Sequence, residues 1–156
     1  DDVIKKGKGL VVVVNKWDLL KKETRTMKDF TDEITYQFKA LSHYPILFIS
    51  AKTKQRVSKV VGVAQQVYKA RKKTISTSKL NGFLQGILRK KSPPATQGKV
   101  INMKYMTQVN AAPHLFVIFT NYPKLVPMSY KRFIENQLRE AFDLMGAPIR
   151  ISFRRK

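Results

Sequence analysis

Two short apolar runs in the first half of the chain are rich in β-branched and large aliphatic residues. The first is Leu10–Val14 and the second is Ile46–Ile49. Neither run alternates with polar residues. Continuous apolar runs of this length are typical of strands that are buried on both faces, as in a parallel sheet. We therefore predict two buried strands that belong to one parallel sheet.

Each apolar run is followed by a segment with helical spacing. Apolar residues recur every three or four positions from Met27 to Leu41 and again from Val57 to Val67, which predicts two amphipathic helices. The order strand–helix–strand–helix is typical of a parallel α/β sheet. Two strands are too few for a complete sheet of this class, so we expect an α/β fragment whose missing part precedes Asp1.

The second half of the chain begins with a basic stretch rich in Ser and Thr, residues 71–78, which we interpret as a linker. Helical spacing over Leu80–Leu88 predicts an amphipathic helix, and the segment Ser92–Gly98 is typical of a loop. From Lys99 to Val109 apolar and polar residues alternate, which predicts a strand with one solvated face. On this pattern Ile101, Met103, Tyr105 and Val109 share the buried face.

Three further elements complete the second half. Leu115–Thr120 is typical of a strand, and Ile149–Phe153 of another. Between them the apolar spacing predicts a helix with Ser129 as its N-cap and Gly146 just beyond its end. The order helix–strand–strand–helix–strand predicts a small α+β domain.

The net charge of the chain is +21, from 31 Lys and Arg against 10 Asp and Glu. A charge of this size favours a polyanionic partner, and the simplest one is the phosphate backbone of RNA. The basic runs do not sit on one amphipathic helix with an apolar face, so an anionic membrane is a weaker candidate. Each run is also compatible with an ordinary solvated surface. The runs are Arg71–Lys73, Arg89–Lys91, Lys131–Arg132 and Arg154–Lys156.

Several classes of chemistry lack the residues that they need. There is no cysteine, which excludes disulfides and thiolate chemistry;. His43 and His114 are the only histidines, and neither lies in a pattern typical of a catalytic triad;. No cluster of carboxylates supports a metal-dependent nuclease, and no apolar run approaches the ~20 residues of a transmembrane helix.

Polar residues follow both apolar strands, and they carry the most specific signal in the sequence. The first strand leads into Asn15-Lys16-Trp17-Asp18 and the second into Ser50-Ala51-Lys52. Ligands of open α/β sheets bind beyond the carboxyl ends of the strands. The pair N-K-x-D and S-A-K resembles the guanine-recognition loops of P-loop GTPases. The alternative is a pair of strand ends capped by polar residues.

Guanine presents a ring N–H beside an exocyclic amine, and one carboxylate can accept a hydrogen bond from both. Asp18 is the candidate carboxylate. A backbone N–H such as that of Ala51 can donate to the base carbonyl, and Asn15 can brace the loop and reach the base. The aliphatic stem of Lys16 can lie along the face of the ring. Adenine would leave the acceptors of Asp18 unpaired, which disfavours it.

The chain as a whole resembles the C-terminal half of the Der (EngA) family of bacterial double GTPases. The resemblance implies that residues 1–73 are the C-terminal part of a P-loop GTPase domain, so that this domain is incomplete here. It implies that residues 74–156 form a KH-like domain. The matching stretches are Val11–Leu20, Ile46–Val57, Thr74–Leu84, Tyr105–Val109 and Phe133–Phe153.

The sequence contains no G-x-x-x-x-G-K-[ST] loop, the element that holds phosphates and magnesium in these enzymes;. The resemblance implies that the intact protein binds GTP or GDP with Mg²⁺ and hydrolyses GTP. We expect this chain alone neither to bind GTP measurably nor to hydrolyse it, and we assign it no catalytic residue. The cofactor-binding candidates are Asn15, Lys16, Asp18, Ser50, Ala51 and Lys52.

The KH-like half lacks the G-x-x-G loop with which ordinary KH domains clamp RNA;. Any RNA contact must therefore come from charge, and docking of a neighbouring GTPase domain is an equally open use of the same residues. Tyr105, Phe116 and Phe119 are expected in the core rather than as stacking platforms. The candidate RNA contacts are Arg89, Lys90, Lys91, Lys131, Arg132, Arg150, Arg154, Arg155 and Lys156.

The resemblance implies a role in assembling the large ribosomal subunit in the bacterial cytoplasm, with ribosomal RNA and the missing GTPase domains as partners. The alternative is an autonomous basic module that binds RNA or ribosomes without any dependence on nucleotide. Whether the parent protein contains a Walker-type loop distinguishes the two.

Overall fold

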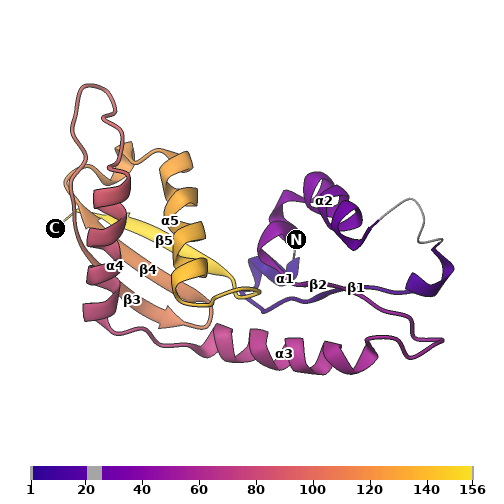
Figure 1. Cartoon of the computed structure of the whole chain (residues 1–156). Helices are drawn as coiled ribbons and strands as arrows, with labels where there is room; N and C mark the ends of the chain where they lie inside the picture. Colours follow the sequence, from indigo (N-terminus) through magenta and orange to yellow (C-terminus); the bar gives the residue numbers. More distant parts are fainter. Residues whose placement is uncertain (1, 21–25, 156) are drawn as a thin grey trace. The chain divides into compact units, whose positions relative to one another are not determined.

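The computed structural model describes residues 2–20 and 26–155. They form two compact units (Figure 1). The first unit holds the residues up to Ala70 together with Met145–Ala147, and the second holds Arg71–Leu144 and the residues from Pro148 onward. The domain identities implied for residues 1–73 and 74–156 stay predictions.

The first unit is built around a small parallel sheet. Strand β1 (Val12–Val14) pairs in parallel with β2 (Ile46–Phe48), with Val12 opposite Ile46 and Val14 opposite Phe48. From β1 onward the order of strands and α-helices is the one that the apolar pattern predicts, whereas the short helix α1 before it was not predicted. The helices of this part are α1 (Asp2–Lys5), α2 (Met27–Gln37) and α3 (Val57–Lys72), of which α3 ends just inside the second unit.

The prediction that the first strand is buried on both faces is wrong. Val13 is 40% exposed, and Val12 and Val14 are only partly buried. In the described part of the chain this sheet contains two strands, and α2 buries none of its residues. A sheet this small leaves part of each strand in contact with solvent. The apolar side of α3 is likewise only partly covered: Val67 is buried, whereas Val61 is exposed to solvent.

Helix α2 is shorter than its apolar spacing predicts. It begins with a capping box, in which Thr26 accepts from the Asp29 N–H and Asp29 accepts from the Thr26 N–H;. It ends at Gln37, and a 3-10 helix follows over Lys39–His43. The 3-10 turn keeps a spacing of about three residues, so Leu41 continues the apolar pattern without being part of the α-helix.

The second unit has the predicted order of elements, with two helices against a three-stranded sheet (Figure 1). Strand β4 is central, antiparallel to β3 and parallel to β5. The interpretation of residues 71–78 as a linker is wrong for half of them, because α3 runs to Lys72 and α4 begins at Thr77, which leaves residues 73–76 between the helices. The elements are α4 (Thr77–Lys90), β3 (Met103–Ala111), β4 (His114–Thr120), α5 (Met128–Ala141) and β5 (Ile149–Arg154).

The core of the second unit lies between the helices and one face of the sheet. Its buried side chains come from all five elements and from segments beside them. The helices bury one face each, so the amphipathic spacing of α4 and α5 is a reliable signal. At the α4–α5 end, the Tyr130 hydroxyl donates to the Lys91 carbonyl over 2.6 Å. The core includes Leu80, Leu84, Met106, Phe116, Ile118, Ile134, Leu138 and Leu144.

The predicted alternation in β3 is wrong after Met103. Met106 is fully buried, whereas Tyr105 is 41% exposed. The pairing with β4 shifts register between Met103 and Tyr105, and such an irregularity turns the following side chains to the opposite face. Asn81 on α4 supports this arrangement, because its side chain accepts from the Met106 N–H over 3.0 Å and donates to the Met106 carbonyl over 3.2 Å.

Both predicted ends of α5 also differ in the structure. The helix begins at Met128 after Pro127, so Ser129 is not the N-cap. At the other end Asp143, with φ 51°, takes the left-handed position expected for Gly146. The Leu144 N–H donates to the Arg139 carbonyl over 3.0 Å, which is the bond of a Schellman motif.

Gly146 has a different role, within the first unit. Its N–H donates to the His43 carbonyl over 2.9 Å, and its carbonyl accepts from the Leu10 N–H over 3.2 Å. The residue has φ +77°, and a Cβ atom there would lie 2.5 Å from Val67 Cγ2 and 3.1 Å from Pro45 Cδ. Only glycine fits this position without displacing its neighbours.

Candidate guanine-recognition site and basic surface

The two polar loops meet at one edge of the first unit's sheet. Because β1 and β2 are parallel, the residues after Val14 and after Phe48 leave the sheet at the same edge;. The backbone joins them further, since the Trp17 N–H donates to the Ile49 carbonyl over 3.0 Å. The Trp17 ring is 4% exposed and packs on Phe30 and Phe48, as expected for a residue that anchors the loop.

Asn15 links the two loops directly. Its Oδ1 accepts hydrogen bonds from the Lys16 N–H over 2.7 Å and from the Ala51 N–H over 3.0 Å. Lys16 takes a left-handed conformation, with φ 65°, so the backbone reverses sharply after the strand. The expected bracing role of Asn15 has a clear geometric basis in these two bonds.

Asp18 is exposed and interacts with the second loop. A hydrogen bond from the Ser50 hydroxyl is the largest influence on the carboxyl and lowers its pKa below the ordinary value. Desolvation acts against this shift, and the charge of Lys52 adds a smaller lowering. Ser50 itself is fully buried, and its Oγ also accepts from the Thr53 N–H over 3.1 Å. Asp18 is therefore ionised at neutral pH, with its acceptors available.

The structure adds one constraint on the expected use of Ala51. Its N–H already donates to Asn15 Oδ1, so a base carbonyl that approaches Ala51 must share this donor or displace Asn15. The side chains of Lys16 and Lys52 are exposed at the same edge. All six predicted residues of the two loops thus lie at or beside this edge.

We expect Ser50→Ala to raise the pKa of Asp18 toward its ordinary value. The substitution removes the hydroxyl that stabilises the ionised carboxylate, so the carboxyl is protonated at a higher pH than in the unmodified chain. The measurement is a ¹³C NMR pH titration of the Asp18 carboxyl. Lys52→Gln is the matched control and should raise this pKa less. A larger rise in Lys52→Gln than in Ser50→Ala would contradict the assignment.

The predicted basic residues of the second unit fall into two groups. One group lies where α4 ends and α5 begins, and the Tyr130–Lys91 hydrogen bond joins these two helix ends. The Lys91 Nζ also lies 5.3 Å from the Phe133 ring centre. The other group lies on β5 and just beyond it. The first contains Arg89, Lys90, Lys91, Lys131 and Arg132, and the second contains Arg150, Arg154 and Arg155. Lys156 lies outside the described residues.

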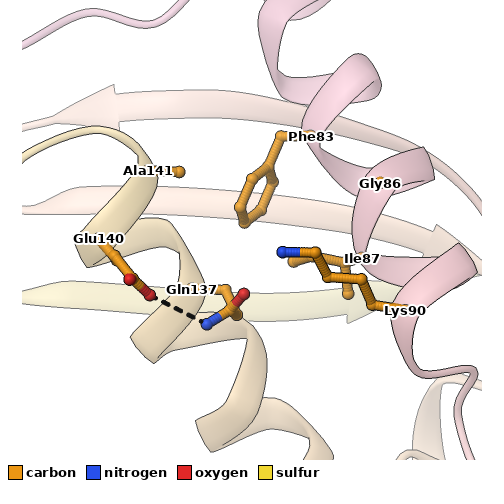
Figure 2. Close-up of a pocket in the computed structure, with 7 residues that line it drawn as sticks. All are labelled: Phe83, Gly86, Ile87, Lys90, Gln137, Glu140 and Ala141. Atoms are coloured by element: carbon orange, nitrogen blue, oxygen red, sulfur yellow. Dashed lines mark hydrogen bonds between the residues drawn. The ribbon is translucent and has the colours of Figure 1, made fainter.

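A cleft of about 340 Å³ runs between α4 and α5 (Figure 2). Phe83 projects into it from α4, and on α5 the Gln137 side-chain amide donates to Glu140 over 3.2 Å. Of the predicted RNA contacts only Lys90 lines this cleft. A lysine opposite a glutamate gives no uniform positive charge, so the cleft is a poor match for a phosphate backbone.

A second, smaller cleft was not anticipated from the sequence. It measures about 180 Å³ and lies at the end of the sheet where β4 and β5 finish. The Lys99 Nζ lies 5.0 Å from the ring centre of Tyr122, which borders this cleft. Lys104 is isolated in the sequence, and strand pairing brings it to the same cleft as Arg155. The lining residues are Lys104, Thr120, Asn121, Tyr122 and Arg155.

Within residues 2–20 and 26–155, no group of three or more His, Asp or Glu side chains is placed to hold a metal ion. A search of the same described ranges finds no helix with the length and hydropathy to cross a membrane.

Comparison with known proteins extends over nearly the whole chain. The GTPase Der of Lactobacillus johnsonii is 45% identical over 150 residues, which cover 96% of this chain and 34% of that protein. The GTPase Der of Chlorobium phaeobacteroides is 44% identical over 151 residues, which cover 97% of this chain and 35% of that protein. The chain thus spans about a third of the length of these relatives.

A protein-family model described as the KH-domain-like C-terminal region of EngA bacterial GTPase enzymes matches residues 74–154. This match covers more than half of the chain and all five elements of the second unit. The order helix–strand–strand–helix–strand and the mixed sheet agree with a KH-like domain. The chain therefore belongs to the family of KH-domain-like C-terminal regions of EngA bacterial GTPases.

Proposed function

We propose that this chain is the base-reading and RNA-contacting part of a GTP-binding protein that acts in assembly of the large ribosomal subunit in the bacterial cytoplasm. The relatives, each called GTPase Der, support a GTP-dependent activity of the whole protein. That activity uses GTP or GDP with Mg²⁺. The remaining GTPase domains and ribosomal RNA are the partners that this proposal implies, and no membrane partner is proposed.

One observation carries the nucleotide half of the proposal. Two loops 36 positions apart are joined by the bond from the Ala51 N–H to Asn15, and Asp18 accepts from Ser50 of the second loop. This places an ionised carboxylate and a shareable backbone donor at one edge. A guanine has an N–H and an amine for the carboxylate and a carbonyl for the donor. Asp18 and the backbone N–H of Ala51 therefore recognise the guanine base.

The residues that hold phosphates and magnesium in P-loop enzymes are not in this sequence;. Within this proposal the chain contributes recognition of the base and no step of hydrolysis. Base contacts without phosphate contacts give little affinity, because the charge-assisted bonds to the phosphates are missing. The chain alone should accordingly bind neither GTP nor GDP measurably.

The RNA half of the proposal rests on charge and its placement. The group at the end of α4 and the start of α5 gathers five basic residues on one end of the domain. Its side chains can neutralise phosphates and release counterions, which makes binding steeply dependent on salt. The autonomous RNA-binding module is the second candidate, and it predicts the same salt dependence without any effect of nucleotide.

We expect the triple variant Arg89→Gln, Lys90→Gln and Lys91→Gln to weaken RNA binding and to flatten its salt dependence. Each lost phosphate contact lowers the slope of log affinity against log salt by roughly 0.7 for a single strand. The measurement is a fluorescence anisotropy titration with RNA over a range of KCl concentrations. The control, Lys28→Gln, Lys39→Gln and Lys59→Gln, changes the same charge on exposed residues of the first unit. Equal slopes in the two variants would contradict the placement.

A further inference from the structure

The three-stranded sheet of the second unit has one face that its helices do not cover. Both α4 and α5 pack on the face that carries Phe116, Ile118 and Ile151 (Figure 1). Side chains at the alternate positions of β4 and β5 point away from these helices. On β5 these positions are Arg150, Ser152 and Arg154, and their partners on β4 are Leu115, Val117 and Phe119.

The register shift in β3 places an aromatic pair on this outer face. Tyr105 lies opposite Phe119, and Phe119 lies opposite Arg154, so the three side chains form one row across the sheet;. The Tyr105 and Phe119 ring centres are 5.8 Å apart. Tyr105 is 41% exposed and Arg154 is exposed, whereas Val117 is buried. The accessible aromatic surface is therefore confined to the Tyr105 row.

Basic residues border this row at one end of the sheet. Lys104 lies in the register shift of β3 and Arg155 lies one residue beyond the end of β5, so the alternation of the strands does not hold either side chain to the helix side of the sheet. Both line the cleft of about 180 Å³ described above. The cleft is held in shape by Asn121, which donates to the Val100 carbonyl over 2.9 Å and accepts from the Asn102 N–H over 2.8 Å. These bonds fix the segment that carries Lys99 beside Tyr122.

The acidic residues of this half lie elsewhere. Residues 74–156 contain three, Glu135, Glu140 and Asp143, and all of them lie on α5 or directly after it. No carboxylate therefore comes from the strands that form the outer face, in the described residues of β3, β4 and β5. An aromatic row with a purely cationic border suits a ligand that has both flat rings and negative charge.

We propose that the stacking face, defined as Tyr105, Phe119 and Arg154 with Lys104 and Arg155 at its end, binds an unpaired base of single-stranded RNA and the phosphate next to it. The base stacks on the exposed Tyr105 ring, and the phosphate enters the Lys104–Arg155 cleft. Aromatic side chains on open sheets bind bases in this way, with little dependence on sequence. This inference rests on the proposed RNA contact and names the form of RNA that the domain prefers.

The test compares Tyr105→Leu with Tyr36→Leu in the full 156-residue chain. Tyr36 is 81% exposed on α2, so its replacement removes an equivalent ring from the other unit. The probes are a labelled oligouridylate of about eight nucleotides, within the site sizes of single-strand binders, and a blunt RNA duplex. Tyr105→Leu should lower affinity for the oligouridylate roughly tenfold and leave affinity for the duplex unchanged. Tyr105→Trp should retain or strengthen single-strand binding.

The outcomes separate this inference from the proposed function. If the unmodified chain binds neither probe, the proposed RNA contact fails and the stacking face fails with it. If the chain binds RNA and the two Tyr→Leu variants have equal affinity for oligouridylate, the stacking face is overturned while RNA binding stands; the face is then a surface for protein docking. Equal losses on both probes would also overturn it, because a duplex offers no unpaired base. Unchanged duplex binding shows that Tyr105→Leu is folded.

Discussion

Asp18→Asn should shift base preference from guanine to xanthine by two orders of magnitude or more. The Asp18 carboxylate accepts from two N–H groups of guanine in our proposal, and each charge-assisted bond contributes about 1.5–3 kcal/mol. An amide keeps one acceptor and adds a donor, which faces the guanine amine unfavourably and suits the second carbonyl of xanthine. Affinity for GDP should therefore fall roughly a hundredfold or more, and affinity for the xanthosine diphosphate should rise.

This measurement needs a protein that also holds the phosphates. The GTPase Der of Lactobacillus johnsonii is about three times as long as the region that matches this chain. We would join this chain to the part of that protein that precedes the matched region. Competition against a labelled nucleotide then gives affinities for the guanosine, xanthosine and adenosine diphosphates. Asp32→Asn, an exposed carboxylate on α2, is the control and should change none of them. An unchanged preference in Asp18→Asn, or micromolar GTP binding by the isolated chain, would contradict the proposal.

Gly146→Ala should destabilise the first unit by about 2–6 kcal/mol. A left-handed conformation costs a residue other than glycine about 1–3 kcal/mol, and φ is +77° here. The new Cβ would also lie 2.5 Å from Val67 Cγ2, and overpacking of this kind costs about 1–3 kcal/mol. Since whole domains are stable by only about 5–15 kcal/mol, this single methyl group should lower the unfolding midpoint clearly.

Two other glycines separate the conformational cost of Gly146→Ala from its steric cost. Gly98 has φ +69° with nothing within 4 Å of its Cβ position, so Gly98→Ala reports the conformational cost alone. Gly62 lies in α3 with open space around it, and Gly62→Ala should stabilise the helix by about 0.5–1 kcal/mol;. Urea unfolding followed by the fluorescence of Trp17, the single tryptophan, gives the free energy for the first unit, which holds Gly146 and Gly62. Far-UV circular dichroism of the same samples also reports the second unit, which holds Gly98. An effect of Gly146→Ala no larger than that of Gly98→Ala would exclude the steric part.

Element type and order could be predicted wherever one local pattern dominated. The apolar runs at Val12–Val14 and Ile46–Phe48 pair in parallel as expected, and the amphipathic spacing of α4 marks the side chains that it buries. The alternation in β3 failed because its register depends on bonds from Asn81, 25 positions away. No local pattern reports such a partner, so the alternation predicts a buried Tyr105 and does not predict the buried Met106.

In the candidate site, too, local residue types predict some features, whereas others depend on the three-dimensional structure. The residue types after the two strands were sufficient to predict that Asp18 and Ser50 lie at one edge, because parallel strands share their carboxyl ends;. That the Ala51 N–H is already engaged by Asn15 depends on loop geometry, which spacing does not encode. The grouping of Lys104 and Arg155 depends on strand register in the same way.

Because Met106 points into the core, oxidation of its thioether can be used to detect opening of the sheet;. Met103 and Met106 are buried, whereas Met128 and Met145 are more than half exposed. Sulfoxide formation follows access of peroxide to the sulfur. Brief peroxide treatment should therefore modify Met128 and Met145 first, and appearance of sulfoxide at Met106 marks molecules in which β3 has separated from α4.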